Sequence, residues 1–220
     1  MTRAAEGWQH PEVPAAQARL ADRELVDWRA GGPHGPFDAA RALLGAMAPS
    51  PVTLLEVGCG AAYYREIVHA VHPRTTYYGC DYAPGMVAQA HLRYPGIAFR
   101  QSDQRDLGAY ADASMDCVWN GAALLHLLDA DGWAQAIAEA VRVSRRWLAF
   151  HRVPVRPAGL PSALHDSEFY DRAAPTTIHE RYVARAEWEA LLAPFRVVQV
   201  ECWSEPDADP MWESVLAEKR

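Results

Sequence analysis

The architecture of this chain can be inferred from the segment Leu54-Leu55-Glu56-Val57-Gly58-Cys59-Gly60-Ala61-Ala62. An apolar run ends in an acidic residue, two glycines then alternate with other residues, and a helix-compatible segment follows. This order is typical of a first β-strand, a tight turn and a helix N-terminus in a nucleotide-binding α/β domain. The glycines allow a sharp turn and bring bare backbone close to a ligand. The segment therefore predicts a ligand site at the end of a buried strand.

A second acidic residue, Asp81, ends the next predicted strand at residues 75–81. It follows the turn by about 20 residues, the distance expected for an acid that binds a ribose. Two ligand classes use such a site: nicotinamide or flavin dinucleotides, and S-adenosylmethionine (SAM). Dinucleotide sites favour a third glycine where this chain has Tyr63, and Glu56 would repel a pyrophosphate. The same carboxylate suits the sulfonium and ammonium groups of SAM, so charge favours SAM.

Four segments resemble the motifs of the class I SAM-dependent methyltransferases, in their small-molecule branch. They are residues 56–60, 81–86, 99–103 and 116–126, and the resemblance runs through most of the chain. One position departs from it, because Ala62 stands where many members carry a third glycine. The resemblance implies SAM as the cofactor and a cofactor site formed by Glu56, Gly58, Cys59, Gly60, Asp81, Tyr82, Met86, Asp103, Gln104 and Asn120.

The resemblance also implies a role for several of these residues. Glu56 is expected to hold the amino group of SAM, directly or through water, beside backbone of the glycine turn. Asp81 is expected to bind the ribose hydroxyls, and Tyr82 to stack on the adenine. Asp103 is expected to accept a hydrogen bond from the adenine amino group.

The alternation of strands and helices after Val52 predicts an α/β fold with a doubly wound, mostly parallel sheet, which the resemblance makes seven-stranded. We expect a single SAM-binding domain with an antiparallel hairpin at its C-terminal end. Its parts are a helical N-terminal cap (1–50), a cofactor-binding core (51–153), a lid-like segment (154–185) and a C-terminal helix and hairpin (186–220). His165, Tyr170 and His179 form a polar group within the lid-like segment.

Composition limits the remaining classes of function. The net charge of −7 argues against a nucleic-acid partner, and no apolar run approaches the roughly 18 residues needed to span a membrane. The four cysteines are widely spaced and form no metal-binding pair, and the histidines suggest no metal site either. We therefore expect a cytoplasmic protein with reduced thiols and no metal. The N-terminal helices offer a contact for a homodimer.

The substrate is expected beside the carboxyl ends of strands one, four and five. Methyl transfer requires an aligned and desolvated nucleophile, and a histidine titrating near neutrality can serve as its base. The candidates for catalysis are His126 and His151. His126 could equally cap a helix or touch the cofactor, and His151 could be a hydrogen-bonded histidine at the rim of the domain. The candidates for substrate contact are Tyr64, Arg152 and Trp28, and Arg152 could instead be a solvated charge. Trp8 is a second tryptophan that could cover the substrate.

Three functions follow from these observations. The first is a SAM-dependent methyltransferase that transfers a methyl group to an oxygen or nitrogen of a small-molecule, aromatic or polar, acceptor. The second is a SAM-binding protein that uses the fold as a scaffold or for other chemistry. The third is a NAD-dependent oxidoreductase. Tyr63, which stands in place of the third glycine of dinucleotide sites, argues against this function.

Overall fold

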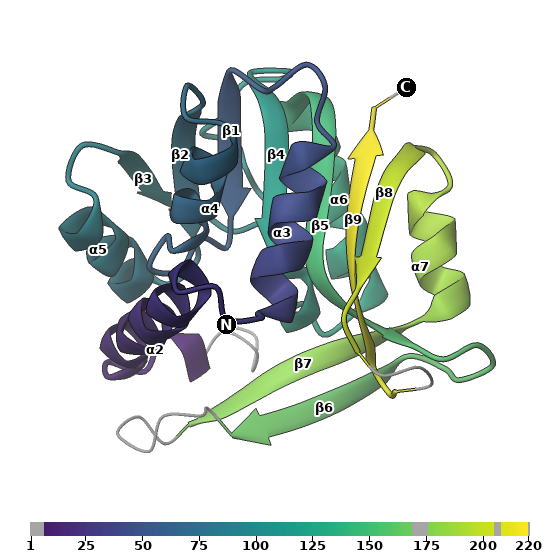
Figure 1. Cartoon of the computed structure of the whole chain (residues 1–220). Helices are drawn as coiled ribbons and strands as arrows, with labels where there is room; N and C mark the ends of the chain where they lie inside the picture. The colour runs from purple at the N-terminus through teal and green to yellow at the C-terminus, as the bar shows by residue number, and fades with distance from the viewer. Residues whose placement is uncertain (1–6, 169–175, 205–207, 220) are drawn as a thin grey trace.

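The computed structural model of this chain describes residues 7–168, 176–204 and 208–219. A central sheet carries five parallel strands in the order β3-β2-β1-β4-β5 (Figure 1). Their bounds are β1 (Thr53–Val57), β2 (Thr76–Asp81), β3 (Ala98–Gln101), β4 (Met115–Gly121) and β5 (Ser144–Arg156).

Two antiparallel strands complete the predicted sheet at its C-terminal end. They are β8 (Arg196–Cys202) and β9 (Met211–Glu218); β9 pairs with β5 on one side and with β8 on the other. The predicted fold class, a doubly wound and mostly parallel sheet with an antiparallel C-terminal hairpin, is therefore confirmed.

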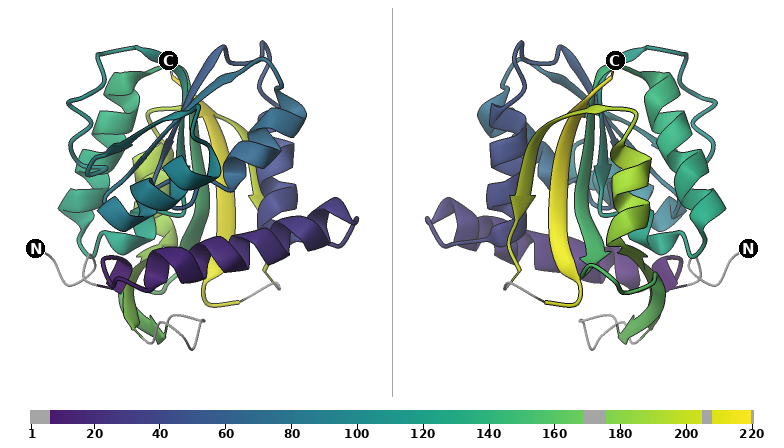
Figure 2. Two further views of the ribbon diagram at one scale, coloured as in Figure 1. Left: turned by 90° about the vertical axis from the view of Figure 1, so that its left-hand side faces the viewer. Right: turned by 90° about the vertical axis from the view of Figure 1, so that its right-hand side faces the viewer.

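Helices cover both faces of the sheet because residues of each central strand alternate between two apolar clusters (Figures 1 and 2). Leu54 and Ala149 belong to the cluster under α3 (Gly35–Gly45), α4 (Tyr64–Val71) and α5 (Pro84–Arg93). Leu55 and Phe150 belong to the cluster under α6 (Ala130–Val143) and α7 (Arg185–Leu192). Within the described ranges, no helix combines the length and apolarity needed to cross a bilayer.

The N-terminal helix α2 (Val13–Arg29) lies across the carboxyl edge of the parallel strands (Figure 2). Val13 and Ala16 are fully buried and pack with Met86 of α5 and with Ile178. The helix therefore closes the edge at which the sequence predicts the ligand site.

The segment predicted as lid-like contains a β-hairpin that the sequence analysis did not foresee. It is formed by β6 (Ala163–Glu168) and β7 (Thr177–Ala184), and β7 also pairs in parallel with the end of β5 at Val155 and Arg156. The hairpin runs along the carboxyl edge of the sheet (Figure 1), and with it the sheet has nine strands. Residues 169–175, which include Tyr170, lie outside the described residues.

Candidate cofactor and acceptor site

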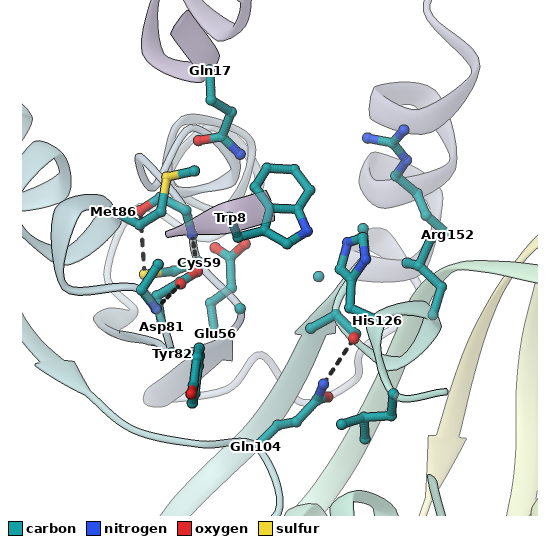
Figure 3. A pocket seen from close by; sticks show the side chains of 18 of the residues that line it. Trp8, Gln17, Glu56, Cys59, Asp81, Tyr82, Met86, Gln104, His126 and Arg152 are labelled. Carbon is teal, nitrogen blue, oxygen red and sulfur yellow. Dashed lines mark hydrogen bonds between the residues drawn. The ribbon is translucent and has the colours of Figure 1, made fainter. Parts of the chain in front are cut away.

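A cavity opens at the carboxyl edge of β1, β2, β4 and β5, beneath α2 and β7 (Figure 3). Asp81 and Tyr82 lie on one side of it, His126 and Arg152 lie on the opposite side, and Glu56 lies between them. Most of the predicted site residues line this cavity: Glu56, Gly58, Cys59, Gly60, Tyr64, Asp81, Tyr82, Met86, Asp103, Gln104, His126 and Arg152. Three others, Asn120, His151 and Trp28, lie outside the lining.

The turn after β1 requires its glycines for two separate reasons. Gly58 and Gly60 have φ angles of +72° and +52°, a region that favours glycine. A Cβ atom on Gly58 would lie 2.4 Å from the Cβ of Ala123, and one on Gly60 would lie 2.6 Å from the side-chain nitrogen of Gln17. Ala62 has a φ of +58°, so the alanine in place of the third glycine is held in a strained conformation.

Asp81 is fixed by the backbone that surrounds it. One carboxylate oxygen accepts a hydrogen bond from the amide of Gly60 and the other from the amide of Ala83, both at 2.9 Å. Burial raises the pKa of Asp81 above its usual value, while these two amides act in the opposite direction. Each oxygen keeps a further lone pair, so a pair of ribose hydroxyls can still be bound.

Glu56 is a buried carboxylate with one unsatisfied oxygen. Its side chain is 1% exposed, and Oε2 accepts a hydrogen bond from the Tyr77 hydroxyl. Oε1 has no hydrogen-bond partner among the described residues. Burial raises the pKa of Glu56 to about 8. Such a group is costly to leave uncompensated, and an ammonium group in the cavity would supply both the missing charge and the missing donor.

Gly121 makes room for this carboxylate from the neighbouring strand. A Cβ atom at that position would lie 2.7 Å from Glu56 Oε1. The glycine at the end of β4 therefore leaves room for the unsatisfied oxygen, although the sequence analysis did not single it out.

The residues predicted to face the adenine are largely satisfied by protein partners. Arg105 donates two hydrogen bonds to Asp103, from Nε to Oδ1 at 3.0 Å and from Nη2 to Oδ2 at 2.6 Å. These hydrogen bonds lower the pKa of Asp103. Gln104 donates to the carbonyl of Ala123 at 2.8 Å and accepts from Asn120 at 3.0 Å. Arg105 and Gln104 thereby fix the shape of this wall of the cavity.

Asn120 supports the wall from behind instead of facing the cavity. Its Oδ1 accepts from the amides of Ala123 and Leu124 at 3.3 and 3.2 Å, at the start of the short 3-10 helix η1 (Leu124–His126). The predicted cofactor contact of Asn120 is therefore corrected to a supporting role, because both ends of its amide are engaged by protein groups.

His126 reaches the cavity from the end of η1. Its Nδ1 lies 3.3 Å from the carbonyl oxygen of His179, and its ring meets that of Trp8 edge-on at 5.0 Å. Burial, aided by the positive charge of Arg152, lowers the pKa of His126 to about 4. The ring is consequently neutral at neutral pH and is a weak base.

His151 lies behind the cavity wall, with 1% of its surface exposed. Its Nε2 is 2.7 Å from the Tyr64 hydroxyl, and its Nδ1 is 2.7 Å from the hydroxyl of Ser214. Both ring nitrogens are therefore occupied by protein partners. The predicted role of His151 as a base that contacts substrate is corrected for this geometric reason.

Trp28 also lies away from the cavity. Its indole nitrogen donates to Asp38 at 3.3 Å, and its ring packs edge-on against Phe37. It joins α2 to α3, and the tryptophan from the N-terminal region that lines the cavity is Trp8. The predicted substrate contact of Trp28 is therefore corrected to helix packing.

Several lining residues were missed by the sequence analysis. Gln17 comes from α2 and accepts from the amide of Ala61 at 3.0 Å. Glu180 comes from β7, and Trp212 from β9. All three come from elements outside the cofactor motifs, and no sequence pattern distinguishes them from solvated or packing residues.

Comparison with known proteins agrees with this geometry. Residues 55–147 match the family model described as "Methyltransferase domain". The trans-aconitate 2-methyltransferase of Methylobacterium nodulans is 38% identical over 58 residues, which are 26% of this chain and 22% of that protein. The malonyl-[acyl-carrier protein] O-methyltransferase of Anoxybacillus flavithermus is 37% identical over 83 residues, 34% of this chain and 32% of that protein. The matches thus span between a fifth and a third of these relatives.

Solved structures resemble the chain over a larger part of its length. The magnesium protoporphyrin IX methyltransferase of Synechocystis PCC 6803, with bound S-adenosylhomocysteine (SAH), has a TM-score of 0.60 at 16% identity and covers 84% of this chain and 81% of its own. A methyltransferase from Methanosarcina mazei has a TM-score of 0.63 at 16% identity, covering 81% of this chain and 96% of its own. The match over residues 55–147 and the shared architecture together identify the chain as having the fold of the class I SAM-dependent methyltransferases.

Proposed function

We propose that the protein is a SAM-dependent methyltransferase that transfers a methyl group to an oxygen or nitrogen atom of a small molecule. The observation that carries the proposal is Glu56, a buried carboxylate with an unsatisfied oxygen beside the glycine turn. Neither a pyrophosphate nor an apolar ligand would compensate this group, whereas the ammonium group of SAM would.

Different residues of the chain bind different parts of the cofactor. Glu56 binds the ammonium group, and the turn at Gly58, Cys59 and Gly60 lies along the methionine portion. Asp81 binds the ribose hydroxyls. The adenine lies between Tyr82 and Met86 on one side and the wall made by Asp103 and Gln104 on the other. When bound, SAM supplies an electrophilic methyl group on a positively charged sulfur.

Each of the two relatives supports one part of the proposal. One is named for trans-aconitate, which supports a small-molecule acceptor, and the other is named as an O-methyltransferase, which supports oxygen as the methylated atom. The cavity suits such an acceptor because α2 and β7 cover it and aromatic side chains line the side away from Asp81. The expected homodimer and cytoplasmic location stay predictions.

Calorimetric titration with SAH, with NADH in parallel, tests the proposal. We expect micromolar binding of SAH and no binding of NADH. Glu56→Gln keeps the shape of the side chain but removes its charge, and it should weaken SAH binding by about 100-fold. Glu189→Gln, an exposed substitution on α7, is the matched control and should bind as wild type does.

A folded protein that binds no SAH would contradict the proposal. Binding of NADH alone would favour the oxidoreductase alternative. Tight SAH binding without methyl transfer to any compound of a broad acceptor panel would favour the alternative of a SAM-binding scaffold.

A further inference from the structure

Arg152 occupies an irregular position in β5. The pairing of Phe150 with Val215 and of Val153 with Glu213 leaves two residues, His151 and Arg152, opposite the single residue Ser214. This is a β-bulge, and Arg152 has a φ of +59° within it. Glycine is the residue favoured in that conformation. The chain therefore carries a strained arginine where a glycine would be less costly, and the bulge turns its side chain into the cavity.

Hydrogen bonds connect the backbone of Arg152 to the residues beside its side chain. The Ser214 hydroxyl accepts from the Arg152 amide at 3.3 Å and also lies 2.7 Å from His151 Nδ1. The other ring nitrogen, His151 Nε2, lies 2.7 Å from the Tyr64 hydroxyl. The Arg152 guanidinium lies beside this hydroxyl and works against the rise that burial causes in the pKa of Tyr64.

Aromatic rings surround the guanidinium, and the carboxyl group of Glu180 in the same cavity interacts with its charge. Its central carbon lies 6.0 Å from the centre of the Trp212 ring, and Tyr63 and His126 line the same side of the cavity. A planar cation held against aromatic rings, with its orientation fixed, matches the geometry of a carboxylate bound through two parallel hydrogen bonds.

We infer that the methyl acceptor is a small molecule with a carboxylate group, that Arg152 binds this carboxylate, and that a carboxylate oxygen receives the methyl group. The inference rests on the proposed function and names the substrate class of that same site. Tyr64, His151 and Ser214 are then positioning residues for Arg152.

The chemistry of this step balances without an added reactant. A carboxylate oxygen forms a bond to the methyl carbon while the carbon–sulfur bond breaks, and the electron pair of that bond stays on sulfur. The negative charge of the acceptor and the positive charge of the sulfonium disappear together, so an enclosed cavity favours the reaction. The product ester is neutral and has lost its attraction to Arg152.

No proton has to be removed from the acceptor in this step. A carboxylate is already ionised at neutral pH, whereas a hydroxyl or an ammonium group would need a base. The absence of a need for a base fits the state of the two histidines that the sequence predicted as bases. His126 is only weakly basic, and His151 is enclosed by Tyr64 and Ser214.

The test measures discrimination between charged and neutral ligands. SAH-saturated protein is titrated with benzoate, with trans-aconitate and with benzamide, the neutral analogue of benzoate. We expect at least one carboxylate to bind at least tenfold more tightly than benzamide. Arg152→Gln should abolish this preference, and Arg152→Lys should retain part of it. The exposed substitution Arg41→Gln on α3 is the matched control and should leave it unchanged.

Transfer from methyl-labelled SAM to a panel of carboxylic acids gives a second measurement. We expect label that alkali releases as methanol, because methyl esters are hydrolysed by base and methyl ethers and methylamines are not. The inference is overturned if neither carboxylate binds better than benzamide, if Arg152→Gln keeps the preference, or if the label is stable to alkali. If the folded wild-type protein did not bind SAH, the proposed function itself would be overturned.

Discussion

The two ends of the cavity are built in different ways. The cofactor end is formed by the first two strands and the backbone of the turn at residues 58–62, and two nearby amides fix the carboxylate of Asp81. The acceptor end is assembled from α2, η1, the bulge in β5, and strands β7 and β9. Under the proposed function, the first end binds SAM, which is the same for any acceptor, and the residues of the second end can vary with the acceptor. Substitutions should therefore separate cofactor affinity from acceptor preference.

After the loss expected for Glu56→Gln, the largest expected effect is the pH dependence of SAH affinity. The pKa of Glu56 is about 8 in the free protein, so its carboxyl is mostly neutral at pH 6 and must ionise to bind an ammonium group. Affinity should consequently rise with pH, by about 50-fold between pH 6 and pH 8. Tyr77 and Cys59, which also face Glu56, have pKa values raised well above this range and stay neutral. Calorimetry across the pH range measures the effect.

Glu56→Gln is the control for this dependence. The variant should bind SAH weakly and with no comparable change between pH 6 and pH 8. An equal pH slope in the variant would assign the titration to another group and would remove Glu56 from the account.

Asp81→Ala is expected to give the next largest effect. The substitution removes the proposed acceptor of two ribose hydroxyls and the partner of the Gly60 and Ala83 amides, so SAH binding should weaken by about 2 kcal/mol, roughly 30-fold. Asp112→Ala, at a side chain that is 80% exposed, should bind SAH as wild type does. An unchanged dissociation constant for the Asp81 variant would refute its assignment to the ribose.

Much of the cofactor end could be predicted from the sequence because its determinants are contiguous. The run from Leu54 to Ala62 specifies a strand, a turn and a helix start, and Asp81 at the end of β2 is adjacent to that turn because β1 and β2 pair in parallel. The roles given to these residues remain proposals, but their convergence on one cavity follows from local patterns.

The acceptor end could not be predicted in the same way. The side to which Arg152 points depends on one extra residue in β5 relative to β9, and strand alternation alone gives no signal of a bulge. The β6–β7 hairpin carries mainly polar, partly exposed side chains, so no apolar alternation revealed it. Gln17 and Trp8 reach the cavity only because α2 packs across the sheet edge.

Tyr64→Phe should affect the acceptor end alone. It removes the hydroxyl that lies beside Arg152 and 2.7 Å from His151 Nε2, and the preference for benzoate over benzamide should fall about fivefold, the effect of one lost hydrogen bond. The SAH dissociation constant should change less than twofold. Tyr94→Phe, a substitution outside the cavity lining, is the matched control. A large loss of SAH affinity in the Tyr64 variant would show that the two ends are not independent.

Ala62→Gly is expected to give the smallest effect, confined to stability. Glycine relieves the positive φ of this position at some cost in chain entropy, for a net gain in the free energy of unfolding of about 0.5 kcal/mol. Ala90→Gly, at an equally buried helical position, should lose about 1 kcal/mol. Urea unfolding of both variants measures the difference, and a gain at both positions would contradict the strain assigned to Ala62.

A crystal structure of the complex with SAH would test the role of Glu56 at the level of single atoms. We predict the amino nitrogen of SAH within hydrogen-bond distance of Glu56 Oε1, the ribose hydroxyls on Asp81, and the sulfur directed toward the side of the cavity that holds Arg152. An amino group bound elsewhere, with Glu56 Oε1 still lacking a cationic partner, would refute the assignment of Glu56 to the ammonium group.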